Sequence, residues 1–277
     1  MHVTDDQLRA RLAAMEQTAR AAGAHALNYF HRRAGLEIET KRALTDMVSV
    51  ADREVEQLIR AGLQAAFPHD AFLGEEYGLT SGSSGLTWVV DPIDGTAPFL
   101  NGLPGWCVSI GVMDAKGPLL GAIYAPVLDE MFLGGRGQGA TLNGRPTQVS
   151  QRFDLSSGLL GFGSNDRASA RRIGQLQQEF SAQGIAQVRY GSGALMLAYV
   201  AAGRLVGFCE ARMSLWDCLA AYALIEAAGG RTAGFGPDAI NGHPFGVLAS
   251  IPQDFDRLTA MTRFDLPDWD VAETGME

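Results

Sequence analysis

The sequence predicts a layered α/β (α+β) protein in two halves, residues 1–150 and 151–277, packed as one unit. Three observations favour this fold class. Amphipathic helical patterns occupy roughly the first 70 residues, short apolar runs broken by Gly and Pro follow from residue 88, and strands alternate with helices after residue 154. The composition agrees, because 47% of the 277 residues are hydrophobic and 19% are charged, which is typical of a globular protein with a large core.

The N-terminal patterns predict two helices. In the first, Leu8, Leu12, Met15 and Ala19 recur at helical spacing, and a second apolar stripe at the same spacing covers 55–67. The following segment, 78–85, is rich in Gly and Ser. It predicts a mobile loop that is too short to be a linker between domains.

The apolar runs after Trp88 are typical of a largely antiparallel sheet, with Asn143-Gly144 as a hairpin turn. Beyond residue 154, helical periodicity returns between shorter apolar runs. Predicted strands cover 88–90, 107–113, 119–124, 131–133, 188–190, 205–210 and 245–249, and predicted helices cover 167–182, 193–202 and 216–228.

Charge and hydropathy exclude several classes of protein. Lys and Arg number 22 against 31 Asp and Glu, a net charge of −9, which argues against nucleic acid as a partner. The longest nearly apolar stretch, 194–203, is about half the length of a membrane-spanning helix, so we expect no membrane partner. The acidic start of the chain predicts a cytoplasmic protein, and the unpaired spacing of Cys107, Cys209 and Cys218 predicts reduced core thiols.

Two acids end the apolar run that starts at Trp88. Asp91 and Asp94 are three residues apart, and Gly95-Thr96 then offers backbone N–H groups at the start of a short helix, where an anion can bind. The alternative is that Asp94 only caps this helix and Asp91 only forms a turn. For this motif in isolation, the alternative is favoured.

Two further segments carry acids at comparable positions. Glu75-Glu76 follows the apolar run 71–73, and because adjacent side chains of a strand point to opposite sides, only one should face a site. Asp217 falls in the first turn of the predicted helix 216–228. The alternatives are a solvated pair of glutamates and a capping box formed by Ser214 and Asp217.

If these segments converge, Glu75, Asp91, Asp94 and Asp217 place four negative charges in one cleft. Two carboxylates about 5 Å apart repel each other by about 3 kcal/mol at an effective dielectric constant near 20, so four of them need cations or protons. Two divalent ions would balance the charge. An all-oxygen ligand set favours Mg²⁺ or Mn²⁺ over Zn²⁺, and two such ions can activate water for hydrolysis of a phosphate ester.

Taken together, these motifs resemble those of the inositol monophosphatase family, within the superfamily of Mg²⁺-dependent, lithium-sensitive phosphatases. The resemblance extends more weakly to Thr40-Lys41, Asp46 and Asp52. It implies an α-β-α-β-α sandwich of the sugar-phosphatase type and a homodimer. The motifs that carry it are Gly74-Glu75-Glu76, the run from Trp88 to Phe99, Val108-Ser109-Ile110-Gly111, Trp216-Asp217 and Glu226-Ala227 with Gly229-Gly230.

The resemblance also implies the roles of individual residues. Glu75, Asp91 and the carbonyl of Ile93 would bind one Mg²⁺, Asp91, Asp94 and Asp217 a second, and a third, weaker ion would contact Glu75 through waters. Thr96, partnered by Asp52 or Glu75, would orient the metal-activated water, with Lys41 nearby. The residues implied to contact phosphate or the alcohol portion of the substrate are Gly95, Thr96, Gly191, Ser192, Gly193, Glu210 and Asp217.

The implied activity is hydrolysis of a small polyol or amino-alcohol phosphate, such as inositol 1-phosphate. Alternatives are histidinol phosphate, fructose 1,6-bisphosphate and a 3′-phosphonucleotide. A different class of function is an interaction module with incidental activity, as in some bacterial relatives that bind the transcription machinery. Two departures from the family pattern concern Pro98, which has no N–H for phosphate, and Cys218-Leu219, which is bulkier than the usual small residues.

Overall fold

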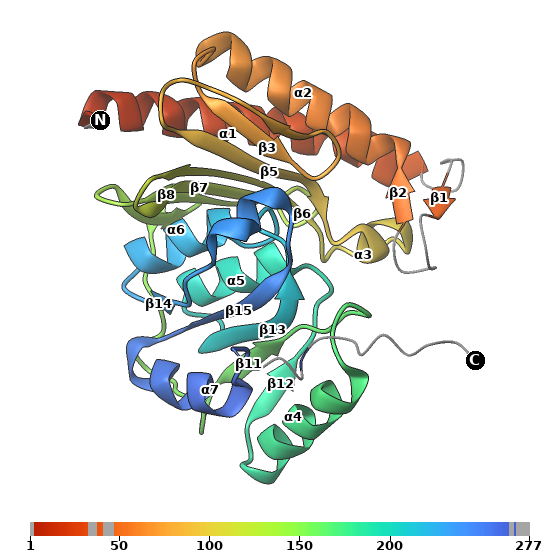
Figure 1. Cartoon of the computed structure of the whole chain (residues 1–277), viewed down its shortest axis with the longest axis vertical. Helices are drawn as coiled ribbons and strands as arrows, with labels where there is room; N and C mark the ends of the chain where they lie inside the picture. Colours follow the sequence, from red (N-terminus) through yellow and green to blue (C-terminus); the bar gives the residue numbers. More distant parts are fainter. Residues whose placement is uncertain (1–2, 33–37, 41–46, 266–268, 270–277) are drawn as a thin grey trace.

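The computed structural model describes residues 3–32, 38–40, 47–265 and 269, and these form five stacked layers (Figure 1). Helices α1 (Asp5–Arg32) and α2 (Val50–Ala66) cover the outer face of a first sheet. Helices α5 (Gly193–Ala201) and α6 (Leu219–Ala227) separate it from a second sheet, whose far side carries α4 (Ala170–Ala182) and α7 (Phe255–Thr262). This α-β-α-β-α order confirms the predicted fold class.

The first sheet has eight strands in the order β10-β9-β8-β7-β6-β5-β3-β4. Strands β3 and β5 pair in parallel, which sets Gly74 opposite Val90, and the other neighbours pair antiparallel, as predicted. The strands are β3 (Ala71–Gly74), β4 (Gly78–Thr80), β5 (Thr87–Asp94), β6 (Cys107–Asp114), β7 (Gly117–Ala125), β8 (Glu130–Gly135), β9 (Gly139–Leu142) and β10 (Arg145–Pro146).

The second sheet has five strands in the order β12-β11-β13-β15-β14. Its β11 strand runs parallel to both neighbours, whereas β15 runs antiparallel to β13 and β14. A separate two-stranded sheet joins β1 (Ile38–Thr40) to β2 (Met47–Ser49). The strands of the second sheet are β11 (Leu159–Phe162), β12 (Ala186–Val188), β13 (Gly207–Met213), β14 (Arg231–Thr232) and β15 (Phe245–Ser250). The division of the chain at residue 150 stays a prediction.

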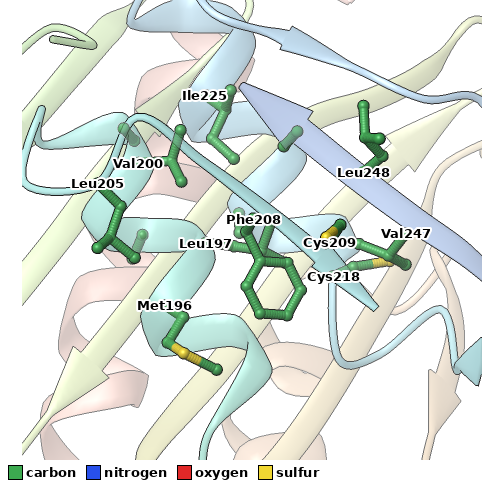
Figure 2. Packing of buried hydrophobic residues seen from close by; sticks show 14 of the residues in the cluster. Met196, Leu197, Val200, Leu205, Phe208, Cys209, Cys218, Ile225, Val247 and Leu248 are labelled. Atoms are coloured by element: carbon green, nitrogen blue, oxygen red, sulfur yellow. The ribbon is translucent and has the colours of Figure 1, made fainter. Parts of the chain in front are cut away.

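The largest hydrophobic cluster lies where α5 and α6 pack on the second sheet (Figure 2). Both helices are apolar on nearly every side, because one face meets each sheet. Phe208 of β13 is fully buried in this cluster, and Cys209, Cys218 and also Cys107 are buried free thiols, as predicted. Within the described residues, helices of the length and apolarity needed to cross a membrane are absent.

Several predicted boundaries are wrong. The segment 78–85 includes the short strand β4 and is not a loop throughout. The strand predicted at 88–90 continues to Asp94, because a register shift against β6 between Asp91 and Asp94 accommodates Pro92. The last predicted helix begins at Leu219 instead of 216, since residues 214–218 form a tighter turn closed by bonds from Asp217 N to Ser214 O and from Cys218 N to Leu215 O, both 3.3 Å. The predicted strands also omit β1, β2, β9, β10, β11 and β14.

Helix α6 rests directly on the backbone of the first sheet. Gly111 of β6 and Gly121 of β7 are paired across the sheet, and both face Ala220 of α6. A Cβ added at Gly121 would lie 2.0 Å from the carbonyl oxygen of Ala220. The two glycines therefore set the distance between α6 and the sheet.

We predict that Gly121→Ala destabilises the protein, because the helix must move away from the strand. The expected loss is about 1–3 kcal/mol in the free energy of unfolding, measured by urea denaturation. Gly174→Ala is the matched control, since that glycine is exposed on α4 with nothing within 4 Å of its added Cβ. The control should be neutral or stabilising by up to about 1 kcal/mol. An unchanged midpoint for Gly121→Ala would contradict the close contact.

Candidate active site

A cleft of about 220 Å³ opens at the end of β5, where the first sheet meets α5 and the turn that precedes α6. Its walls come from both sheets and from the short helix α3 (Thr96–Leu100). The cleft is lined by Glu75, Asp91, Ile93, Asp94, Gly95, Thr96, Ala97, Gly163, Ser164, Asn165, Arg167, Arg189, Gly191, Gly193, Met196, Glu210, Met213 and Asp217. It thus gathers most of the residues that the sequence singled out.

Three aspartates meet at the base of the cleft. Asp91, Asp94 and Asp217 each offer a carboxylate oxygen, and these three atoms lie within 4.8 Å of one another. Asp91 and Asp94 are buried, with 2% and 9% of their surface exposed. The structure therefore confirms the convergence of the segments around residues 91–94 and 217, which spacing in the sequence could not establish.

Backbone N–H groups hold each aspartate in place. The N–H of Ile93 donates to Asp91 Oδ1 at 3.0 Å, and the N–H of Ser214 donates to Asp217 Oδ2 at 2.8 Å. The second bond is one of the two in the capping-box alternative, but α6 begins only at Leu219, so Asp217 closes the turn before the helix and also lines the cleft. These bonds leave little freedom to the carboxylates.

Asp94 connects the first sheet to the N-terminus of α5. Its Oδ2 accepts a hydrogen bond from the N–H of Ala194 at 2.7 Å and another from the Ser192 hydroxyl. Ser192 is fully buried and is the N-cap of α5, its Oγ accepting from the N–H of Leu195 at 3.1 Å. The Ser192 hydroxyl is thus bonded to Asp94 and to the first turn of α5, and its predicted contact with substrate stays a prediction.

Glu75 follows β3 and joins the aspartates from the neighbouring strand. Its N–H donates to the carbonyl of Val90 in β5 at 3.3 Å, and its side chain lines the cleft. The lining does not include Glu76, whose backbone N–H instead donates to Glu56 Oε2 at 2.8 Å. The prediction that one of the two adjacent glutamates faces the site is confirmed.

The enclosed carboxylates disfavour one another's ionisation. Burial, followed by the charge of Asp217, raises the pKa of Asp94 to about 7 and that of Glu210 to about 8. The pKa values of Asp91 and Glu75 lie well above the usual range because surrounding protein limits solvation and neighbouring carboxylates add repulsion. Burial also raises the pKa of Asp217, although the N–H of Ser214 and the charge of Arg167 oppose this shift.

The donor set fits a hard divalent cation. Carboxylates of Glu75, Asp91, Asp94 and Asp217 and the carbonyl of Ile93 could supply oxygen ligands. Among the residues that the structure describes, His and Cys side chains are absent from the cleft lining. The structure therefore contains an acidic cluster that could hold a metal ion. A bound cation would offset the repulsion among its buried carboxylates. The identity of the ion and the ligand role of each residue stay predictions.

The predicted water-orienting residues lie on two elements. The Thr96 hydroxyl donates to the carbonyl of Ile93 at 3.4 Å, so its partnership with Asp52 or Glu75 stays a prediction. Asp52 is buried in the first turn of α2, with 3% of its surface exposed, and its charge contributes to the raised pKa of Glu75 and Asp91. Lys41 and Asp46 lie outside the described residues.

The predicted substrate-contacting glycines lie in the cleft wall. Gly95, Gly191 and Gly193 all line it. Gly95 has a φ of +95°, and a Cβ there would lie 2.8 Å from the carbonyl oxygen of Gly105, so both conformation and space require glycine. Pro98 is buried beneath Gly191, whose added Cβ would lie 2.5 Å from Pro98 Cγ. Proline at this position therefore fills the base of the wall.

Sequence reasoning missed several residues that shape the site. Asn165, Arg167 and Arg189 line the cleft from loops that carry no recognisable motif. Glu56 is fully buried on α2 and accepts from Arg60 Nε at 2.7 Å and from the N–H groups of Glu76 and Tyr77. Its spacing of four residues from Arg60 was the available signal, because such pairs meet on one face of a helix.

Comparisons with known proteins agree with this geometry. The sequence profile of the inositol monophosphatase family matches residues 7–272. The chain is 37% identical to the Nus factor SuhB of Xylella fastidiosa, over 81% of this chain and 82% of that protein. It is 38% identical to the inositol-1-monophosphatase of Rhizobium meliloti, over 80% and 84% of the two chains. The extragenic suppressor protein suhB from Bartonella henselae superposes with a TM-score of 0.85 at 32% identity, over 92% of this chain and 98% of that chain.

We predict that the metal-free protein loses stability as the pH rises. The pKa of Asp94 is about 7 in the folded protein and near its ordinary value of 3.8 in the unfolded chain, so the folded protein binds more protons between these values. The contribution of Asp94 to the free energy of unfolding is most favourable below its pKa in the unfolded chain. It is fully lost above its pKa in the folded protein, where the buried carboxylate is ionised. With a chelator present, the free energy of unfolding of wild type relative to Asp94→Asn should fall by more than about 1 kcal/mol between about pH 5 and about pH 8.

Urea denaturation at both pH values measures this difference, and Asp238→Asn, an exposed substitution in the 3₁₀ helix Pro237–Asn241, serves as the control. Added Mg²⁺ should stabilise wild type more at the higher pH, because the ion binds ionised carboxylates. Equal pH profiles for wild type and Asp94→Asn would show that Asp94 is not perturbed in this way.

Proposed function

The chain belongs to the inositol monophosphatase family of phosphomonoester hydrolases, and we propose that it hydrolyses a small polyol or amino-alcohol phosphate, such as inositol 1-phosphate, with Mg²⁺ as cofactor. The observation that carries this proposal is the approach of Asp91, Asp94 and Asp217 within 4.8 Å at the base of a cleft that also contains Glu75 and Glu210. A cluster of acids that can bind a cation and a further hydrogen-bond acceptor in the same cleft suit a phosphate ester of a hydroxylated alcohol.

The four acidic side chains and the Ile93 carbonyl are the proposed metal-binding residues. Two Mg²⁺ ions, with a third, weaker one near Glu75 or with Mn²⁺ as a substitute, would polarise the phosphoryl group and lower the pKa of water. The contribution of the chain is to hold the carboxylates in fixed positions through the N–H groups of Ile93, Ala194 and Ser214. Such preorganisation avoids the cost of ordering ligands during the reaction.

The start of α3 is the proposed phosphate-binding element. The first turn of a helix leaves its N–H groups without acceptors inside the helix, and here these groups belong to Gly95, Thr96 and Ala97, all of which line the cleft. Pro98 offers none. We assign to Thr96, together with Asp52 or Glu75, the task of orienting the attacking water. A proton released by that water would pass to one of these carboxylates.

The opposite wall is proposed to bind the alcohol portion of the substrate. Glu210 can accept hydrogen bonds from ring hydroxyls or an amine, and Gly191 and Gly193 leave space beside it. Arg167 and Arg189 also line the cleft and would attract a second phosphate. Fructose 1,6-bisphosphate, histidinol phosphate and a 3′-phosphonucleotide therefore remain the alternative substrates.

We predict that phosphate release will be fastest with a small polyol or amino-alcohol phosphate when these substrates are compared. A chelator should abolish activity, Mg²⁺ should restore it, and millimolar lithium should inhibit it. Asp94→Asn should lower kcat/KM by about 100-fold or more, because the variant loses a charged ligand, whereas Asp238→Asn should leave it unchanged. Faster turnover of a nucleotide would refute the substrate ranking, and activity that resists the chelator would refute the metal mechanism.

A role in binding is the second candidate, because the relative in Xylella fastidiosa is named as a Nus factor. The Asp94→Asn protein distinguishes the two functions in cells. If a phenotype caused by loss of the gene is corrected by wild type and by Asp238→Asn but not by Asp94→Asn, hydrolysis is the required activity. Correction by all three proteins would favour a binding role.

A further inference from the structure

Asn165 lies on the loop after β11 and is held on three sides. Its Nδ2 donates to Glu210 Oε1 at 2.8 Å and to the carbonyl oxygen of Arg212 at 2.6 Å. Its Oδ1 accepts from the backbone N–H of Arg167 at 2.9 Å. A carbonyl oxygen only accepts hydrogen bonds, so the opposite orientation of the amide would set oxygen against oxygen at Arg212. The donor side of Asn165 is therefore fixed toward Glu210.

Glu210 is held so that one carboxylate oxygen meets Asn165 and the other lies against the backbone of Gly163. A Cβ added at Gly163 would lie 1.9 Å from Glu210 Oε2, so a side chain at that position would displace the carboxylate. Both Glu210 and Gly163 line the cleft. A carboxylate has about four acceptor positions, so those that Asn165 leaves can serve a bound molecule.

The surroundings of Glu210 would otherwise disfavour a fixed, ionised carboxylate. Burial and the charges of Asp217 and Asp94 raise its pKa, whereas the hydrogen bond from Asn165 and the charge of Arg167 lower it. Of Asn165 and Arg167, Asn165 is the residue that donates a hydrogen bond to the Glu210 carboxylate. The hydrogen bond from Asn165 therefore favours the ionised form of Glu210 against these effects and holds its carboxylate in a single position.

We propose that Asn165 is a specificity-determining positioning residue, which fixes Glu210 as an acceptor and thereby selects phosphate esters whose alcohol portion carries a hydroxyl or ammonium donor over esters that carry none. The inference rests on the proposed phosphatase function and adds to it a residue that acts on the substrate through Glu210. The alternative is that Asn165 merely anchors its loop to β13 through Arg212.

Kinetics with two substrates separate these roles. Inositol 1-phosphate carries hydroxyl donors, and p-nitrophenyl phosphate has the same phosphate group with no donor on its alcohol portion. In the Mg²⁺-loaded protein, Asn165→Asp removes the donor, sets a negative charge beside Glu210, and should raise KM for inositol 1-phosphate about 10-fold. The kcat for this ester and both constants for p-nitrophenyl phosphate should change less than about twofold. Asn165→Ala, which adds no charge, should act in the same direction.

The control is Asn241→Asp, the same chemical change at an exposed position outside the cleft, which should alter neither KM. A double-mutant cycle with Glu210→Ala gives the sharper test. If Asn165 acts through Glu210, Asn165→Ala should not raise KM further once Glu210 is alanine. Additive effects, or an equal loss on both substrates, would show a structural anchor and overturn the inference.

The kinetics of the wild-type protein distinguish a failure of the proposed function from a failure of this inference. Hydrolysis of neither ester would refute the proposed function and this inference with it. Efficient hydrolysis of p-nitrophenyl phosphate but not of hydroxylated esters would refute the selectivity alone, since the phosphatase chemistry would be intact. Melting temperatures of all variants within a few degrees of wild type would confirm that the kinetic changes do not arise from unfolding.

Discussion

Repulsion among carboxylates is the constraint on which the site depends. Asp91, Asp94 and Asp217 approach within 4.8 Å, and Glu75 shares their cleft. One pair at about 5 Å already costs about 3 kcal/mol at an effective dielectric constant near 20, a large part of the 5–15 kcal/mol that typically separates folded from unfolded protein. The rest of the fold must therefore hold these groups together against their own repulsion until a cation offsets it.

The fold holds Asp94 and Asp217 in place through the middle layer of helices. Asp94 ends β5 in the first sheet, yet its oxygen accepts from Ser192 and Ala194 at the start of α5 in the middle layer. Asp217 is fixed by the turn that leads into α6, which in turn rests on Gly121 of the first sheet. A movement of either middle helix would consequently change the separation of the aspartates. The packing between layers therefore determines the geometry of the site.

The sequence predicted the individual parts of the site better than their assembly. Strand ends followed by acids identified Glu75, Asp91 and Asp94, but their convergence with Asp217 depends on contacts between layers that no local spacing encodes. Ser192 directly precedes a predicted helix, and this position could have indicated its role as N-cap of α5. Asn165 lies on a loop with no periodicity, so the sequence offered no signal for it. The homodimer, the cytoplasmic location and the division at residue 150 stay predictions.

Two buried acids outside the cleft differ from those inside it in how their charge is offset. Asp70 is 7% exposed and accepts from Arg11 at 2.8 Å and from Trp88 Nε1 at 3.0 Å, and fully buried Glu56 accepts from Arg60 at 2.7 Å. In both cases an arginine of the same chain offsets the charge. Asp91 is buried as deeply, yet its carboxylate lies within 4.8 Å of those of Asp94 and Asp217, and burial and the neighbouring carboxylates raise its pKa. The charges of Asp70 and Glu56 are thus offset within the chain, whereas the acids of the cleft repel one another, which supports the proposal that a hard divalent cation binds between them.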